Sequence, residues 1–208
     1  MNRLKFGLHL QELSNDNQLP TRLKLLLDVL YEHAPNHVHV FGLQPHVSDC
    51  LELKSKLERS TRIPWHGYSV YVQASVFLDF LQCLPSPLLM NEIFHEWMEV
   101  TTSGSVLATK AKLMRLCKSL PELNQQLLKH VLLVLRRVCK NAPFTHTTPI
   151  LAGHFAGPSL LWRPSSQFVA YPSENVHRTL AKLVKCLILF LDDIWNDLNE
   201  EVPEQWFI

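Results

Sequence analysis

The sequence predicts an all-α fold organised as a single domain. Apolar residues recur at intervals of three and four over most of the 208 residues, which is the spacing of amphipathic helices. Prolines and serines flank these stretches, where they start or stop helices. Strand patterns are scarce: the short stretch 38–43 could be extended, but no neighbouring segment is suited to pair with it.

The first predicted helix begins after Pro20 and Thr21. It ends before Pro35, because a residue that precedes proline leaves the helical conformation. Its apolar stripe consists of Leu23, Leu26, Leu27, Leu30 and Tyr31. This stripe is wide enough to face the core of a domain.

The next two helices are expected to begin at polar caps. Ser48 and Asp49 are suited to cap the second helix, and Ser69 is suited to cap the third. The stripe of the second helix is short and consists of Cys50, Leu53 and Leu57. The third helix, 70–83, is apolar on nearly every side, so we expect it inside the core.

Five further helices are predicted, at 91–100, 105–119, 121–141, 147–155 and 173–194. The face expected to be buried in the helix 105–119 consists of Leu107, Ala111, Met114 and Cys117. The longest stripe follows Pro121 and consists of Leu127, Leu128, Val131, Leu135 and Val138. In total about eight helices, joined by short loops, fit one helical domain.

The stretch 142–173 is rich in threonine, glycine and proline, and we expect it to be the loosest part of the chain. Its second half, after the short helix 147–155, is expected to be a surface loop. Beyond it, Asp192-Asp193 and Glu200-Glu201 are expected to form a solvated helix end. Trp195 and the apolar residues 206–208 are expected to dock on the domain.

Composition excludes several classes of protein. With 20 Lys and Arg against 19 Asp and Glu, the chain is not built to bind a nucleic acid or an anionic membrane. The longest apolar stretch, 180–194, is shorter than the roughly 18 residues of a membrane span and is interrupted by charges. The N-terminus lacks the apolar segment of a signal peptide.

The five cysteines are scattered singly, which is typical of reduced, mostly buried thiols in a cytoplasmic protein. Among the 11 histidines, His37 and His39 could share one side of an extended segment, and His146 or His154 could join them. No cysteine or acidic residue stands near them at the spacing of zinc ligands. We therefore expect neither a metal nor a cofactor.

Six segments in order resemble the motifs of the RhoGAP domain family. They are 6–10 (FGLHL), 19–20 (LP), 50–57 (CLELKSKL), 74–89 (ASVFLDFLQCLPSPLL), 120–128 (LPELNQQLL) and 157–161 (GPSLL). The resemblance covers about residues 5–195 and implies one RhoGAP-like helical domain over 1–208, with a short tail at 196–208. It also implies a regulator of small-GTPase signalling whose partner is a Rho-family or related GTPase.

The family carries a catalytic arginine at the end of a GxFR loop, just before the second helix. Counting back from Val47, the corresponding residues here are His39-Val40-Phe41-Gly42, so a glycine stands at the arginine position. An arginine supplied in this way contributes roughly 10³–10⁵ to the rate of GTP hydrolysis. Gly42 has no side chain, so the resemblance implies a domain that binds a GTPase without accelerating it, and not an enzyme.

Other polar positions of the family also differ. Its lysine falls at Leu78, its second arginine at Gln82 and its asparagine near Thr145. Together with Phe41 and Gly42, these residues are the candidates for the groove that meets the GTPase. The apolar residues of the motifs are retained while the charged ones are not, and we expect a monomer.

Several alternatives stay open at this point. Arg59 or Arg62 could supply a surrogate charge, which would make the domain a weak activator. Gly42 could instead be a turn glycine that supplies a positive φ. Leu78 could be one more core residue. The whole domain could also be a helical scaffold that binds proteins other than GTPases.

Overall fold

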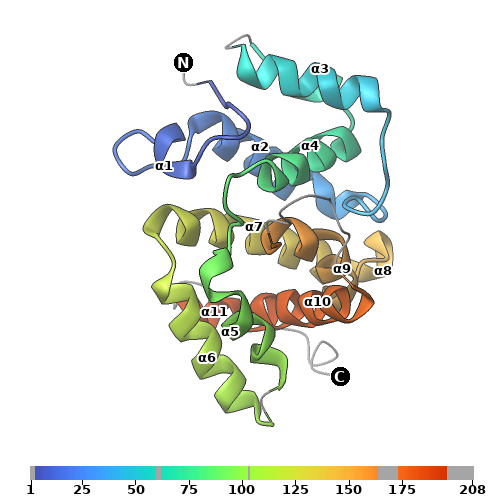
Figure 1. Cartoon of the computed structure of the whole chain (residues 1–208). Coiled ribbons are helices and arrows are strands. Elements are labelled where there is room, and N and C mark those ends of the chain that lie inside the picture. Colours follow the sequence, from blue (N-terminus) through green and yellow to red (C-terminus); the bar gives the residue numbers. More distant parts are fainter. Residues whose placement is uncertain (1–2, 60–61, 103, 164–172, 196–208) are drawn as a thin grey trace.

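The computed structural model describes residues 3–59, 62–102, 104–163 and 173–195. Within these ranges there are eleven α-helices and no β-strands (Figure 1). The nearest approach to a sheet is an isolated antiparallel bridge between Asn15 and Gln18. The all-α prediction is therefore confirmed. The stretch 38–43, which could have been extended, is a series of turns.

The α-helices are α1 (Leu10–Leu13), α2 (Thr21–His33), α3 (Val47–Glu58), α4 (Val70–Gln82), α5 (Phe94–Met98), α6 (Val106–Ser119), α7 (Glu122–Lys140), α8 (Ala142–Thr145), α9 (Pro149–Leu160), α10 (Glu174–Leu189) and α11 (Leu191–Trp195). Short 3₁₀ helices η1 (Ala34–Asn36), η2 (Trp65–Gly67), η3 (Asn91–Ile93) and η4 (Val100–Thr102) connect some of them. The number exceeds about eight because α1, α5, α8 and α11 are single turns.

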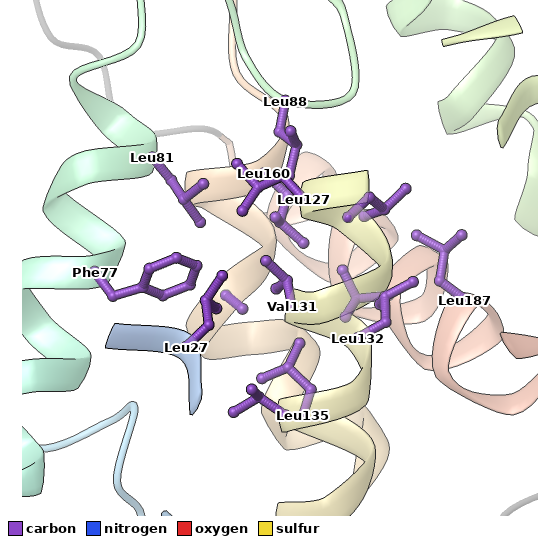
Figure 2. Close-up of a cluster of buried hydrophobic side chains, with 14 of the residues drawn as sticks. Leu27, Phe77, Leu81, Leu88, Leu127, Val131, Leu132, Leu135, Leu160 and Leu187 are labelled. Atoms are coloured by element: carbon purple, nitrogen blue, oxygen red, sulfur yellow. The ribbon is translucent and has the colours of Figure 1, made fainter. Parts of the chain in front are cut away.

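Helix α7 lies at the centre of the core. In Figure 2, Val131 points toward Leu27 of α2 and Phe77 of α4, while Leu132 points toward Leu187 of α10. All five side chains are buried. The predicted stripe of α7 is buried at every position, which confirms the face assigned from the sequence: Leu127, Leu128, Val131, Leu135 and Val138. Each buried leucine contributes about 1.5–3 kcal/mol relative to exposure.

The pairing of α9 with α10 is the most extensive helix contact of the fold. Two glycines make it close. A Cβ added at Gly153 would lie 2.4 Å from the carbonyl oxygen of Ala181, and one at Gly157 would lie 3.1 Å from Cβ of Leu180. Since residues four apart share one helix face, the α9 backbone lies directly against α10.

Helix α9 corrects two expectations. It continues to Leu160, through Gly157 and Pro158, where we expected a surface loop to follow Phe155. The described part of the loose stretch 142–173 is therefore mostly helical, and much of α9 is buried. Glycine and proline, which usually mark loops, here allow close packing and occupy a helix end. Residues 164–172 lie outside the described ranges.

The C-terminal helix and the helix 91–100 are both interrupted. Helix α10 begins after Ser173, whose side chain caps it by accepting a hydrogen bond from the Val176 N–H at 3.5 Å. It ends at Leu189, and α11 follows after Phe190. In place of a single helix at 91–100, η3, α5 and the start of η4 follow one another. Side-chain periodicity does not reveal such breaks, because the apolar pattern continues across them.

Two local predictions about helix ends and faces were wrong. Helix α3 begins one residue before Ser48, and the Ser48 hydroxyl donates to the Asp49 carboxylate at 3.1 Å in place of capping the backbone. In α6, Leu107 is 77% exposed. Ala111 is also exposed, whereas Cys117 is buried as predicted and Met114 packs partly against the core; the other buried residues of α6 are Thr109, Leu113 and Leu116. Helix α6 has two partly apolar sides, and its contact with α11 decides which one turns inward.

The acidic pair near the C-terminus is also not solvated as expected. Asp192 receives two hydrogen bonds from the buried Arg136 of α7, at 2.6 and 2.8 Å, and Asp193 forms an ion pair with Lys110 of α6. These contacts hold α11 against both helices, because removing one partner of a buried pair is costly. Trp195 packs against the core as predicted, while residues 200–201 and 206–208 lie outside the described ranges.

The thiols fit the expectation of free cysteines. All five are unpaired; Cys117 and Cys139 are buried and the other three are half-buried. Burial raises the pKa of Cys117 to about 12, so this thiol stays protonated at neutral pH. Among the described residues, none of the helices combines the length and the apolar character required to cross a bilayer.

We expect Gly153→Ala to lower the free energy of unfolding by about 1–3 kcal/mol, because the new methyl group would collide with the Ala181 carbonyl. Helix propensity alone would give the opposite sign, by about 1 kcal/mol. Urea denaturation checks this. The control is Gly104→Ala, where an added Cβ meets nothing within 4 Å and little change is expected. A stabilised Gly153→Ala variant would contradict the close packing of α9 on α10.

A pH dependence follows from the same helix pair. The Nδ1 atoms of His154 on α9 and His177 on α10 are 3.2 Å apart. Burial, then His177 and Arg178, lower the pKa of His154 below 6.5. The unfolded chain therefore binds the proton more readily than the folded one, and stability is lost as the pH falls below about 6.5. Thermal unfolding between pH 5 and 8 checks this, and His154→Gln is expected to flatten the profile. The same substitution at the exposed His46 is the control.

Candidate functional site

Gly42 lies in a tightly turned loop, 37–46, between η1 and α3 (the Gly42 loop). The backbone N–H groups of Gly42 and Leu43 donate to the carbonyl oxygen of His39, at 2.8 and 3.1 Å. His39 adopts the left-handed conformation, with φ 48°. Its own N–H donates to the carbonyl oxygen of Thr145 in α8 at 2.9 Å. The loop is thus tied to a segment far away in the sequence.

Gly42 is required for space and not for backbone conformation. Among the described glycines, Gly7 alone has a positive φ, at 79°. The alternative that Gly42 is a turn glycine with positive φ is therefore wrong. A Cβ at position 42 would lie 2.3 Å from Cζ of Phe155 and 2.6 and 2.7 Å from its two Cε atoms. The Gly42 backbone lies directly against this ring.

The sequence did not identify Phe155 as a residue of the site. It projects from α9, is half-buried, and makes an edge-to-face contact with the ring of His39, with centroids 6.4 Å apart. His39 in turn lies beside His146, with ring centroids 6.0 Å apart. No periodic signal could have revealed this contact, because it joins two segments that lie far apart in the chain.

Two of the predicted groove residues point into the domain. Thr145 is wholly buried, and its hydroxyl donates to the carbonyl oxygen of Val138 at 3.0 Å. Phe41 is part of the hydrophobic core. Neither side chain can meet a partner in this conformation, so both are corrected from contact residues to residues that support the Gly42 loop.

The two predicted residues of α4 lie on one helix face, four positions apart. Leu78 is half-buried and packs against the core, which favours the alternative that it is one more core leucine. Gln82 is exposed, and its Nε2 donates to the hydroxyl oxygen of Ser159 in α9 at 3.0 Å. The structure therefore brings Gln82 close to α9, but it places no charge at either position.

The two candidate surrogate arginines are not brought to Gly42. Arg59 follows the last residue of α3, while Gly42 precedes the first (Figure 1). The 12 residues of α3 span about 18 Å at 1.5 Å per residue. Arg62 follows Arg59 in the chain, and both side chains are exposed.

Exposed apolar side chains occur in the Gly42 loop, in α3, which follows it, and in α8. Four of them, which we call the apolar rim, are Leu43 (51% exposed), Val47 (69%), Leu51 (61%) and Phe144 (54%). Val47 and Leu51 are four residues apart and share the outer face of α3. Leu43 lies in the Gly42 loop. Phe144 lies in α8, which the hydrogen bond from the His39 N–H to the Thr145 carbonyl ties to that loop. These four side chains are therefore the candidates for an apolar contact with a partner beside the Gly42 loop.

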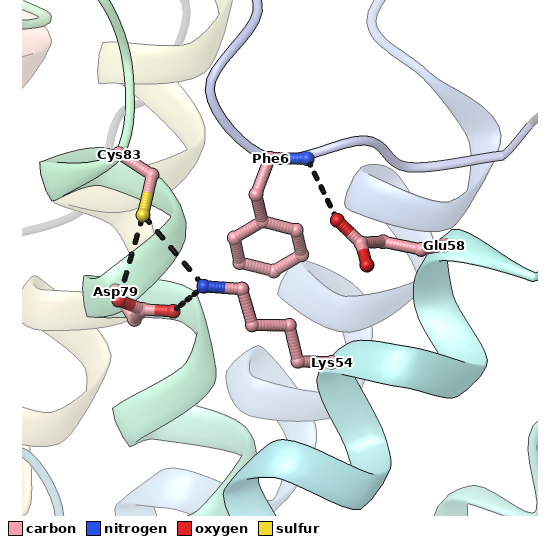
Figure 3. A network of polar contacts seen from close by, with 5 residues as sticks. All are labelled: Phe6, Lys54, Glu58, Asp79 and Cys83. Carbon is pink, nitrogen blue, oxygen red and sulfur yellow. Dashed lines mark hydrogen bonds and ion pairs between the residues drawn. The ribbon is translucent and has the colours of Figure 1, made fainter.

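A polar network joins α3 to α4 and to the N-terminal segment (Figure 3). The Lys54 ammonium lies 2.7 Å from the Asp79 carboxylate of α4 and 4.4 Å from the ring centroid of Phe6. The backbone N–H of Phe6 donates to Glu58 at 3.4 Å. Cys83 completes the group, with its sulfur 3.7 Å from Nζ of Lys54. The buried face of α3 is instead formed by Leu53 and Leu57, while Val47 and Leu51 stay exposed and lie along the same side of the helix as Lys54.

The histidines do not gather into a metal centre in the part of the chain that the structure describes. There, no three His, Cys, Asp or Glu side chains lie close enough together to hold a metal ion. His37 instead packs edge-to-face on Tyr71, with its Nδ1 2.9 Å from the His33 carbonyl oxygen. The site therefore consists of a closed glycine loop and an apolar rim.

Comparisons with known proteins agree with this architecture. Rho GTPase-activating protein 20 of Homo sapiens is 27% identical over 186 residues, which are 89% of this chain and 15% of that protein. The T-cell activation Rho GTPase-activating protein of Homo sapiens is 27% identical over 205 residues, 96% of this chain and 28% of that protein. The chain thus spans less than a third of the length of either relative.

Solved structures show the same fold at lower identity. The BH domain from Graf, the GTPase regulator associated with focal adhesion kinase, superposes with a TM-score of 0.74 at 20% identity, covering 86% of this chain and 94% of that one. Human Rho GTPase activating protein 15 superposes with a TM-score of 0.80 at 14% identity, covering 93% and 92%. The match to the RhoGAP domain spans residues 20–165 and includes the Gly42 loop, α4 and α9. This chain belongs to the RhoGAP domain family.

Proposed function

We propose that this domain binds a Rho-family GTPase and does not accelerate GTP hydrolysis. One observation carries the proposal: at the position where the family resemblance assigns the catalytic arginine, the exposed Gly42 offers no side chain, and the ring of Phe155 occupies the place of a Cβ. A regulator of this kind occupies a GTPase and competes with active GTPase activators.

The chemical reason is the charge of the transition state. As the γ-phosphoryl group transfers, charge spreads over its oxygens, and a guanidinium supplied by a partner stabilises that charge. Leu78 and Gln82 place no charge near this position either, and Arg59 lies beyond the far end of α3. None of these candidate positions is therefore suited to stabilise the transition state more than the ground state.

Binding does not need that charge. Most of the affinity of a protein interface comes from a few well-packed apolar or aromatic side chains near its centre. The apolar rim supplies such side chains next to the Gly42 loop, on the outer face of α3 and on α8. An apolar surface of the GTPase, covered by the rim, would exclude water from both sides of the contact.

The setting of the domain is part of the proposal. We propose that it acts in the cytoplasm, as a monomer, on a membrane-associated or free GTPase. Its nearly balanced charge, 20 basic against 19 acidic residues, offers little electrostatic steering toward a partner. Selectivity would then come from the shape and the apolar pattern of the surface.

Single-turnover GTP hydrolysis by a panel of Rho, Rac, Cdc42 and Rap-type GTPases tests the proposal. The expected result is a rate unchanged, within about twofold, by saturating amounts of this domain, because the roughly 10³–10⁵ supplied by an arginine is missing. Stimulation would show that another group supplies the charge. Arg59→Ala and Arg62→Ala variants would then identify it, and loss of the stimulation in either would make the domain a weak activator.

The affinity for a transition-state mimic provides a second test. We expect the Kd for a GTPase loaded with a non-hydrolysable GTP analogue to equal that for the GDP–aluminium fluoride form within about threefold. A domain that does not recognise the transition state gains nothing from its mimic. Isothermal calorimetry measures both values. A much tighter complex with aluminium fluoride, or no binding of any GTPase at micromolar concentrations, would contradict the proposal.

We expect Leu51→Asp to weaken GTPase binding about tenfold or more, because it places a charge in the apolar rim. The matched control is Leu107→Asp on α6, which alters a leucine of similar exposure away from the Gly42 loop (Figure 1). Both variants are expected to keep the thermal stability of the parent. Equal loss of binding by the two variants would place the partner elsewhere or indicate a non-specific effect.

A further inference from the structure

We propose that Phe155 occupies the arginine position, so that a side chain introduced at position 42 must displace the ring. This inference rests on the proposed function in assigning a meaning to position 42. Its geometric basis is independent of any partner. On this proposal, the effect of a substitution at Gly42 depends on the residue at position 155, and Phe155 is a positioning residue of the site.

Space, and not backbone conformation, limits which residues position 42 can accept. The backbone of Gly42 does not need a positive φ, so its conformation is open to residues with a side chain. The obstacle is the ring of Phe155, whose three nearest atoms lie 2.3–2.7 Å from the place of a Cβ. Real Cβ atoms do not approach other heavy atoms this closely, so one of the two segments must move.

The loop is poorly placed to move. Two backbone hydrogen bonds close it on His39, and a third joins His39 to Thr145. Thr145 is wholly buried and bonded to Val138 and Thr147. Moving the Gly42 loop away from Phe155 therefore breaks the contact with α8 or leaves buried polar groups unpaired, which costs about 1–3 kcal/mol for each group.

Helix α9 is equally restrained. Gly153 and Gly157 lie on either side of Phe155 in the sequence and press the α9 backbone against α10. A shift of α9 away from the loop would drive Gly153 into the Ala181 carbonyl or move the helix along α10. Both alternatives disturb the most extensive helix contact of the fold. The backbone that carries Phe155 therefore stays in place.

The ring itself is the part that can yield. Phe155 is half-buried, and its edge-to-face contact with His39 is the one aromatic contact found for it among the described residues. Rotating the ring outward would free the space above Gly42 and expose more apolar surface to water. An arginine introduced at position 42 therefore competes with the ring for one place. Truncation of Phe155 removes this competition.

A double-mutant cycle on thermal stability tests the space argument without a partner. Gly42→Arg alone is expected to lower Tm by about 2–12 °C, since overpacking costs about 1–3 kcal/mol and each kcal/mol is worth about 2–4 °C in a chain of this size. In the Phe155→Ala background the same substitution is expected to lower Tm by less than about 2 °C. Phe144→Ala, on the neighbouring α8, is the control background, in which the loss should remain. Equal losses in all three backgrounds would overturn the inference.

The activity arm uses a GTPase that the parent domain binds. We expect Gly42→Arg with Phe155→Ala to stimulate single-turnover hydrolysis about tenfold or more above Gly42→Arg alone, as a part of the roughly 10³–10⁵ of a complete site. Equal stimulation by the single and double variants, or none by the double variant, would overturn the claim that the ring keeps an arginine from acting. If the parent binds no GTPase, the proposed function fails, and the stability cycle alone decides this inference.

Discussion

The site depends on the direct contact of the α9 backbone with α10. Without side chains at Gly153 and Gly157, the two helices approach until backbone meets backbone, and α9 is fixed within the core. Phe155 projects from the same helix toward the opposite side, where the Gly42 loop lies. The backbone position of Phe155 is therefore fixed, and the loop makes room for its ring because position 42 has no side chain. One helix contact thus determines what chemistry the neighbouring loop can present.

The arrangement separates recognition from catalysis. Apolar contacts around Gly42 stabilise a bound partner equally before and during a reaction, and such uniform binding does not lower a barrier. A charged side chain at the same place would act differently, because its effect grows as charge develops. The partly exposed pair of Lys54 and Asp79, with Phe6 beside it, uses its charge to join α3 to α4. In the proposed mode of binding, charge supports the structure and apolar groups face the partner.

Much of the fold, but little of the site, could be predicted from the sequence. The stripe of α7 was found because a buried helix repeats its apolar residues with the helical period. The extent of α9 was missed because Gly157 and Pro158 carry the signal of a loop, although here they serve packing. The burial of Thr145 and the cover of Phe155 over Gly42 were missed for a different reason: both are contacts between distant segments. The family resemblance identified position 42 as the arginine position, but it did not reveal the Phe155 ring beside it.

The contact between Gly42 and Phe155 also constrains how this sequence can change over time. A path that restores arginine at position 42 first passes through an overpacked intermediate. A path that first shortens Phe155 passes through one with lost apolar contacts. Each costs a part of the roughly 5–15 kcal/mol that keeps a domain folded, and neither step alone offers a functional gain. Once both residues are in place, a single substitution at either position leads to a less stable protein. Both residues therefore tend to be kept.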